Sequence, residues 1–175
     1  RIHGASVNRT DCGFLRAKPF ISRFFSGLLR PKNNILGNEF AGEVVEVGNE
    51  ITDYQKGDRV FGLRGVQFGC HARYAVMTEQ SALAHLPKSI DYLNAAGICE
   101  GAFYAMNYMK AIKIQSGDSI LINGSTGAIG TAGVQLAKHF GAKITAVGNT
   151  KNIEVSGKSL KKTKLSYLTS TTSAL

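Results

Sequence analysis

Three glycines stand at three-residue intervals in the segment INGSTGAIGTAGVQLAKHFGA, residues 122–142. Gly124, Gly127 and Gly130 come just after an apolar run and just before a segment of helical periodicity. Bare glycines at such a junction allow a tight turn, the approach of a pyrophosphate to the main chain, and close packing of the helix. The N–H groups of the first helical turn would then face the phosphates. The pattern predicts a dinucleotide site, and no Lys-Ser/Thr pair follows Gly130 to indicate a mononucleotide P-loop.

The elements around these glycines have the order strand, helix, strand. SILIN (119–123) precedes them, TAGVQLAKHF (131–140) follows, Gly141 stops the helix, and KITAVG (143–148) is the second strand. This order is the βαβ unit of a parallel sheet. The alternative, in which the glycines serve only turns and packing in an α/β domain, stays open.

The end of the second strand, AVGNTKN, indicates which dinucleotide binds. A site that prefers NAD usually places an acid about 20 residues past the glycines, on the ribose 2′-hydroxyl. No acid stands there, and Lys151 offers a positive charge suited to the 2′-phosphate of NADP(H), although a solvated loop lysine is the alternative. The predicted cofactor-binding residues are Gly124, Ser125, Thr126, Gly127, Ala128, Ile129, Gly130, Gly148, Asn149, Thr150 and Lys151.

The chain before the glycine segment is mostly β in pattern. RIHGASVN alternates like a strand with Ile2 and Val7 facing inward, and EFAGEVVEVG (39–48) and KGDRVFGL (56–63) are typical of strands that end in turns. Residues 91–112 change to helical spacing and predict one connecting helix. The fold expected is therefore α/β, with a β-rich part followed by βαβ.

Composition excludes several classes of protein. The 175 residues are 43% apolar, as in globular proteins, and no run approaches the ~20 apolar residues of a membrane span. The net charge of +9 is scattered without a basic stripe, which argues against nucleic-acid binding. Cys12, Cys70 and Cys99 are odd in number and form no CxxC pair, so a reducing, cytoplasmic location is expected.

Four motifs together resemble the medium-chain dehydrogenase/reductase superfamily, and specifically its zinc-independent branch of quinone oxidoreductases and zeta-crystallin-like proteins. They are GASVNRTD (4–11), GNEFAGEVVEVG (37–48), KGDRVFGL (56–63) and NGSTGAIG (123–130). The resemblance implies a GroES-like domain joined to a Rossmann domain and an oligomeric full-length parent. The division expected from it is a GroES-like domain at 1–92, a connecting helix with the start of the NADP-binding domain at 93–154, and a divergent tail at 155–175.

The resemblance also bears on metal binding. Zinc-dependent members have a cysteine where Asn8 stands and a histidine where Asn38 stands, and an asparagine amide cannot replace either ligand. Cys70 and His71 are adjacent, so on a strand they would point to opposite faces. We therefore expect no metal.

Without a metal, the resemblance implies hydride transfer from the nicotinamide to a quinone, an enone or another carbonyl compound. Asn8 occupies the family's active-site position, and its alternative role is a turn-capping amide. Glu100 and Tyr104 lie at the start of the connecting helix, where members of the family line the cleft, and at i and i+4 they share a helix face. A core tyrosine with a satisfied hydroxyl is the alternative for Tyr104.

The last part of the chain departs from the family pattern. Nine of the last twenty residues are Ser or Thr, with little helical or strand periodicity, which is typical of a disordered tail. Only two strands of the Rossmann sheet are then expected. The sequence is interpreted as a truncated reductase with little activity alone, and the alternative is a non-catalytic fragment or binding module built on the GroES-like domain.

Overall fold

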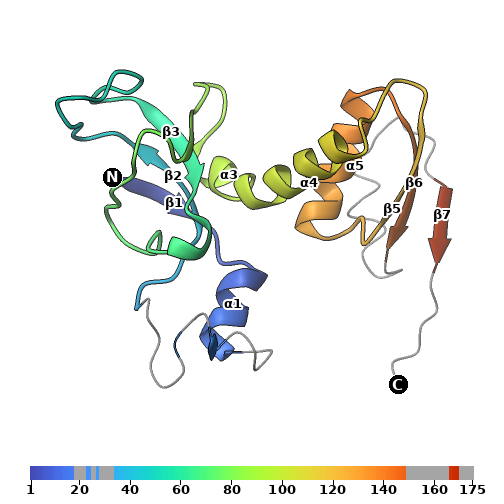
Figure 1. The fold of residues 1–175 in the computed structure, drawn as a ribbon, viewed down its shortest axis with the longest axis horizontal. Helices are drawn as coiled ribbons and strands as arrows, with labels where there is room; N and C mark the ends of the chain where they lie inside the picture. The colour runs from blue at the N-terminus through green and yellow to red at the C-terminus, as the bar shows by residue number, and fades with distance from the viewer. Residues whose placement is uncertain (18–22, 25–26, 28–33, 149–165, 170–175) are drawn as a thin grey trace. The chain divides into compact units, whose positions relative to one another are not determined.

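A computed structural model describes most of the chain, which divides into two compact units, Arg1–Cys99 and Glu100–Leu175 (Figure 1). The described residues are 1–17, 23–24, 27, 34–148 and 166–169, the last four by their backbone.

The first unit contains a four-stranded antiparallel sheet with the strand order β1-β2-β3-β4 (Figure 1). Ala5 of β1 pairs with Phe40 of β2, and Ala41 pairs with Phe61 of β3. The β-rich pattern of the N-terminal part is therefore confirmed. The strands are β1 (Ile2–Ala5), β2 (Glu39–Glu43), β3 (Arg59–Leu63) and β4 (Ala82–His85), and a short 3₁₀ turn, η1 (Gly65–Gln67), follows β3.

Both faces of this sheet are covered. Side chains alternate along a strand, so the neighbouring residues Phe40 and Ala41 of β2 lie on opposite faces, and both are buried. Ala41 lies in one buried cluster with Leu86, Ala95 and Ala96, so helix α3 (Tyr92–Ala96) covers that face. Phe40 lies in another cluster, together with Val60 and Cys70.

Arg59 fixes the segment that leads into α3. Its guanidinium donates to the carbonyls of Pro87 at 3.1 Å and Ile90 at 2.6 Å. The same group lies 4.6 Å from the centre of the Tyr92 ring, at cation–π distance. These contacts connect strand β3 to the first turn of the helix that covers it.

Helix α1 (Arg9–Arg16) was not expected from the sequence pattern. Strand β1 ends at Ala5, and Val7 is 75% exposed, so the predicted inward orientation of Val7 is wrong. Asn8 begins the helix instead, as its N-cap. The physical reason is a capping box, in which the side chains of Asn8 and Asp11 each accept a hydrogen bond from the backbone N–H of the other residue.

The predicted helix over residues 91–112 is two helices. Helix α3 begins after Asp91, whose carboxylate caps it, and ends at Gly97, where the conformation leaves the helical range. Helix α4 (Cys99–Ala111) follows. A single helix is therefore the wrong prediction for this segment, because glycine ends a helix more readily than it continues one.

The second unit contains three parallel strands in the order β5-β6-β7 (Figure 1). Strands β5 (Ser119–Asn123) and β6 (Lys143–Gly148) are joined by helix α5 (Ala128–His139), so the predicted βαβ unit is confirmed. Strand β7 (Ser166–Thr169) lies in the segment expected to have no strand, and that expectation is wrong. Its backbone pairs with β6 from Thr145↔Ser166 to Gly148↔Thr169, and main-chain pairing of this kind does not depend on apolar periodicity.

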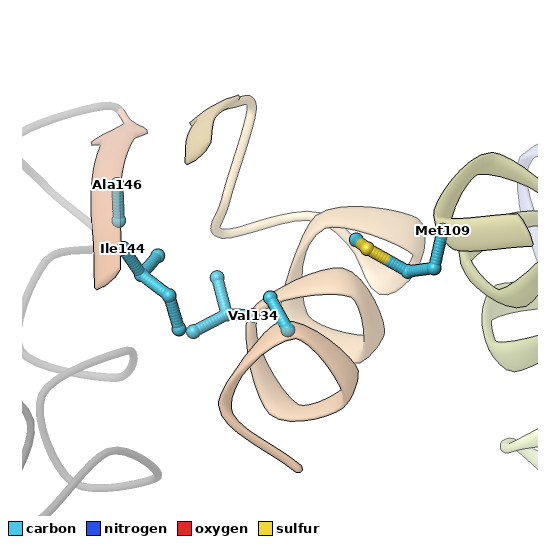
Figure 2. Close-up of a cluster of buried hydrophobic side chains, with 5 residues drawn as sticks. Met109, Val134, Ile144 and Ala146 are labelled. Carbon is cyan, nitrogen blue, oxygen red and sulfur yellow. The ribbon is translucent and has the colours of Figure 1, made fainter. Parts of the chain in front are cut away.

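Helix α5 lies between the sheet and α4. Figure 2 shows Val134 of α5 with Ile144 of β6 on one side and Met109 of α4 on the other. Met109, Val134, Ala137, Ile144 and Ala146 are the buried members of this core. Among the described residues, no helix is long and apolar enough to cross a membrane.

Candidate cofactor and catalytic site

The turn between β5 and α5 is tight because of Gly124. Its φ of +75° lies in the left-handed region, which glycine adopts without strain. The N–H of Gly127 donates to the carbonyl of Gly124 at 3.0 Å and closes the turn. Gly127 is then the N-cap of α5.

Ser125 attaches this turn to the second strand. Its N–H and its hydroxyl both donate to the carbonyl of Val147, at 2.9 Å and 3.1 Å. The residue is 2% exposed, and the hydroxyl of Thr131 donates to its carbonyl at 3.2 Å. Ser125, one of the predicted cofactor-binding residues, thus uses both its N–H and its hydroxyl to hold the turn in place.

Gly130 and Gly148 permit close packing around the turn. A Cβ built at Gly130 would lie 2.1 Å from the carbonyl oxygen of Gly124, so the first turn of α5 packs directly on the turn backbone. A Cβ at Gly148 would lie 2.7 Å from the Cγ2 methyl of Thr126. A side chain at Gly130 would displace the backbone of the turn, whereas one at Gly148 would first displace the side chain of Thr126.

The N-terminus of α5 has backbone donors and no side-chain cap. Asn8 caps α1 and Asp91 caps α3, but at α5 the N-cap residue is Gly127. The first intrahelical N–H is that of Thr131, which donates to Gly127 at 2.8 Å, so the N–H groups of Ala128, Ile129 and Gly130 lie in the unpaired first turn. Among the atoms that the structure describes, a Cβ at Gly127 would come no closer than 3.5 Å to any beyond its chain neighbours. Unpaired donors in the first turn of a helix are a common binding site for anions.

The predicted 2′-phosphate contacts are only partly described. Gly148 ends β6, as the sequence pattern predicts. Asn149, Thr150 and Lys151 lie outside the described residues, so their role stays a prediction.

Two of the predicted catalytic residues lie on α4. Glu100 is half-buried in the first turn of the helix. Tyr104, one turn later, is 40% exposed and packs edge-to-face on Phe103 with a ring separation of 5.6 Å. Between them Gly101 contacts α5, because a Cβ at this position would lie 2.9 Å from the carbonyl oxygen of Ala128. Glu100 and Tyr104 thus belong to the helix that packs against the start of α5.

The third predicted catalytic residue, Asn8, lies in the first unit and uses its side chain fully. Its Oδ1 accepts from the N–H groups of Thr10 at 2.9 Å and Asp11 at 3.2 Å. Its Nδ2 donates to Oδ1 of Asn38 at 2.7 Å and to Oε1 of Glu39 at 3.4 Å. Asn8 thus caps helix α1 rather than a turn, and its role in catalysis stays a prediction.

The polar cluster around Asn8 is deeply buried. Asp11, Asn38 and Glu39 are each 3% exposed or less, and Asp11 accepts from the N–H of Gly37 at 2.8 Å. Glu39 also accepts the hydroxyl of Ser6. Within the part of the chain that the structure describes, no group of three or more His, Cys, Asp or Glu could hold a metal ion.

Sequence reasoning missed three of these features, and two had a readable signal. An Asn followed three residues later by Asp is a capping-box pattern, which could have revealed α1. A small residue in the first turn of α4, Gly101, could have indicated close helix packing. The double donation from Ser125 to Val147 had no signal, because it depends on strand register.

Comparison with known proteins agrees with this geometry. Residues 1–103 match the family described as the alcohol dehydrogenase GroES-like domain. The chain belongs to this family. The antiparallel sheet followed by the βαβ unit is the arrangement expected of medium-chain dehydrogenases/reductases, and the family is one of oxidoreductase enzymes.

Curated relatives of this family resemble the chain over much of its length. The quinone oxidoreductase-like protein 2 homolog of Nematostella vectensis is 38% identical over 68% of the chain and 33% of its own length. The NADPH-dependent alkenal/one oxidoreductase of Arabidopsis thaliana, a chloroplastic protein, is 35% identical over 89% of the chain and 41% of its own length. The chain thus spans well under half of these relatives.

Solved structures show the same fold. The quinone oxidoreductase from Coxiella burnetii superposes with a TM-score of 0.80 at 23% identity, over 95% of this chain and 51% of its own. The CurK enoyl reductase superposes with a TM-score of 0.78 at 23% identity, over 98% of this chain and 50% of its own. At this identity the likeness concerns the fold.

Proposed function

We propose that the chain is part of an NADPH-dependent, zinc-independent reductase of quinones, enones or related small carbonyl compounds. The observation that carries this proposal is the uncapped N-terminus of α5 behind a glycine turn, which offers backbone donors to a pyrophosphate. The absence of an acid in the five residues after Gly148 favours NADPH over NADH. The name of the Arabidopsis relative supports both the cofactor and the type of acceptor.

The bound dinucleotide would supply a hydride, and the chain's own residues would bind and orient the reactants. The amides of Ala128, Ile129 and Gly130 would hold the pyrophosphate, with Ser125 fixing the turn. Lys151 would contact the 2′-phosphate.

A donor is needed for the oxyanion that develops on the acceptor. Tyr104 is the better supported candidate, because its side chain is partly exposed whereas the amide of Asn8 already donates to Asn38 and Glu39. Glu100 lies one helical turn from Tyr104 and would line the same site. For Asn8, whose amide donates to Asn38 and Glu39, a role in catalysis stays a prediction from the sequence.

The amide pair also supports zinc independence. Asn8 and Asn38 stand where the zinc-dependent members have ligands, and their side chains bond to each other. Metal analysis after purification without chelators should find far less than one zinc per chain. Stoichiometric zinc whose removal abolishes activity would contradict this part of the proposal. Three free cysteines further support a reducing location such as the cytoplasm.

Cofactor titration tests the central claim on the chain as it stands. NADPH fluorescence should show saturable binding, and NADH should bind more weakly. Lys151→Ala should weaken NADPH about tenfold or more, because one charge-assisted contact contributes about 1.5–3 kcal/mol, and should leave NADH nearly unchanged. Lys143→Ala, an exposed lysine at the other end of β6, is the matched control and should change neither. Equal losses for both cofactors in Lys151→Ala would refute the preference.

Turnover is better tested in a chimera, because the chain spans only 33% and 41% of the two relatives described above. Residues 155–175 are replaced by the C-terminal half of a complete relative, and NADPH oxidation is followed with a panel of quinones and enones. The chain alone should be far slower than the chimera, and Tyr104→Phe in the chimera should lower kcat by about 100-fold if the phenol is the donor. An unchanged kcat would remove Tyr104 from that role.

A further inference from the structure

Gly101 makes a close contact between α4 and α5. A Cβ built there would lie 2.9 Å from the carbonyl oxygen of Ala128, 3.1 Å from its carbonyl carbon and 3.6 Å from its Cβ. The first two of these atoms belong to the backbone, so no rotamer change could relieve the clash. Any side chain at position 101 must separate the starts of the two helices.

The rest of the contact between these helices is less tight. Gly101, Ala105 and Met109 follow one another at four-residue intervals and are all buried, so they form one face of α4. Opposite them, a Cβ at Gly133 would meet only side chains, the nearest being Ile122 and Met109 at 3.8 Å. Those are ordinary van der Waals distances. An added methyl group is therefore tolerated at Gly133 and not at Gly101.

Ala128 is the residue through which Gly101 can affect binding. It is the first residue of α5, directly after the N-cap Gly127, and its N–H belongs to the unpaired first turn. Displacing Ala128 displaces the donors that an anion would meet. On the other side of the turn, Ser125 is held to Val147 by two hydrogen bonds, so the turn cannot follow the helix without breaking them.

We infer that Gly101 is a positioning residue for the pyrophosphate subsite. By admitting α4 into contact with Ala128, it sets where the first-turn amides of α5 lie relative to the glycine turn. The inference rests on the proposed function for the identity of the ligand, but the effect on the amides is a property of the chain itself. Gly101 does not touch the ligand.

Two glycine variants separate this role from general stability. Gly101→Ala and Gly133→Ala each add one methyl group inside a helix, so each receives the same gain in helix propensity. Hydrogen exchange in the ligand-free protein is measured for the peptide covering residues 124–131. We expect at least tenfold faster exchange in Gly101→Ala, and exchange within about twofold of wild type in Gly133→Ala.

Ligand fragments then identify the subsite. Gly101→Ala should raise the Kd of NADPH and of ADP, which carries a pyrophosphate, by about tenfold or more, since charge-assisted bonds to the phosphates are lost. The Kd of 2′-AMP, which has no pyrophosphate, should change by less than about twofold, because its single phosphate lies at the other end of the adenosine half. A purely structural defect would weaken all three. If Gly101→Ala does not fold in this chain, the same comparison is made in the chimera described above, because a longer chain buries a larger fraction of its surface and tolerates a larger loss of stability.

The outcomes are distinct. Exchange at residues 124–131 that matches wild type, or equal losses for ADP and 2′-AMP, would overturn the positioning role. An identical response in Gly133→Ala would overturn it too. If no form of the protein binds NADPH but Gly101→Ala alone still accelerates exchange in this peptide, the proposed cofactor is wrong while the positioning of the α5 amides by Gly101 is upheld.

Discussion

Asn8 donates a hydrogen bond of 2.7 Å from its side-chain amide to the side-chain carbonyl of Asn38, 30 residues later in the chain. The same amide oxygen caps helix α1, so one side chain connects the start of a helix to the start of strand β2. Asn38 is 1% exposed, and its carbonyl would otherwise lack this donor in the interior. The side chain of Asn8 therefore stabilises both the start of helix α1 and a contact between two segments that are distant in the sequence.

Asn8→Ala should be strongly destabilising. Loss of the cap costs about 1 kcal/mol, and an unsatisfied buried carbonyl costs about 1–3 kcal/mol, so a total of about 2–4 kcal/mol is expected. Asn8→Ser keeps a capping oxygen and should lose roughly half as much. Urea denaturation midpoints measure both. A midpoint for Asn8→Ala equal to that of wild type would show that water replaces the amide at no cost.

Two glycines of the turn should differ sharply in their response to alanine. At Gly130 the added Cβ would lie 2.1 Å from the carbonyl oxygen of Gly124, so the backbone must move, at a cost of about 1–3 kcal/mol or more. At Gly127 the nearest atom would be 3.5 Å away, and the loss should stay below about 1 kcal/mol. Thermal denaturation compares the two variants. A larger loss in Gly127→Ala would mean that the turn is held differently.

The three cysteines should react at very different rates. Burial raises the pKa of Cys70 to about 11 and that of Cys99 to about 12, so both remain thiols at neutral pH, while Cys12 is only partly buried. A thiol reagent at pH 8 should label one cysteine quickly, and Cys12→Ser should remove that fast reaction. Labelling of all three should follow only after denaturation. Rapid labelling of Cys99 in the native protein would contradict its burial.

The same pKa values predict sensitivity to alkali. A folded-state pKa above the ordinary thiol value of about 8.5 favours the protonated form, so this contribution to stability is complete below that pH. It is lost as the pH rises from there toward about 11 at Cys70 and about 12 at Cys99. Urea midpoints between pH 7 and 10.5 should therefore fall less steeply for Cys70→Ala than for wild type. Parallel curves would rule out this contribution.

Asp91 should respond to pH in the opposite sense. The backbone N–H of Asn94, followed by its side-chain amide, holds the pKa of Asp91 below its usual value. A lowered pKa contributes stability that is present above the unfolded value of about 3.9 and is lost as the pH falls through the folded value. The advantage of wild type over Asp91→Asn in urea midpoint should thus shrink between pH 5 and 2. A constant difference across that range would show that the charge of Asp91 has no part in capping α3.

Prediction from the sequence worked best where one physical pattern dominates. The short apolar run of Ile120, Leu121 and Ile122 and the glycines after it specify a strand and a turn whatever else the chain does. Helix α1 was missed because its signal is a cap rather than an apolar stripe, and it contains Gly13. The division between α3 and α4 depends on one residue, Gly97, within a segment that is otherwise helical in pattern.

The candidate site divides in the same way. The residues of the glycine turn could be named from the sequence, because their spacing is local. The hydrogen bonds from the Asn8 amide to Asn38 and Glu39 could not be predicted from the sequence, because these residues come close to Asn8 only when β1 pairs with β2. Strand β7 was also beyond sequence reasoning, because Ser166–Thr169 is held by the register of its neighbour β6 rather than by its own apolar pattern.

The attachment of Ser125 to Val147, 22 residues later, has a consequence for the order of folding. Helix α5 can form from local contacts within about a microsecond, whereas parallel strands pair only after the intervening loop has closed. The glycine turn then reaches its final shape only once β6 has docked beside β5. During refolding, amide protection within α5 should arise before protection at Ser125, and affinity for an anion should return with the later of these two events.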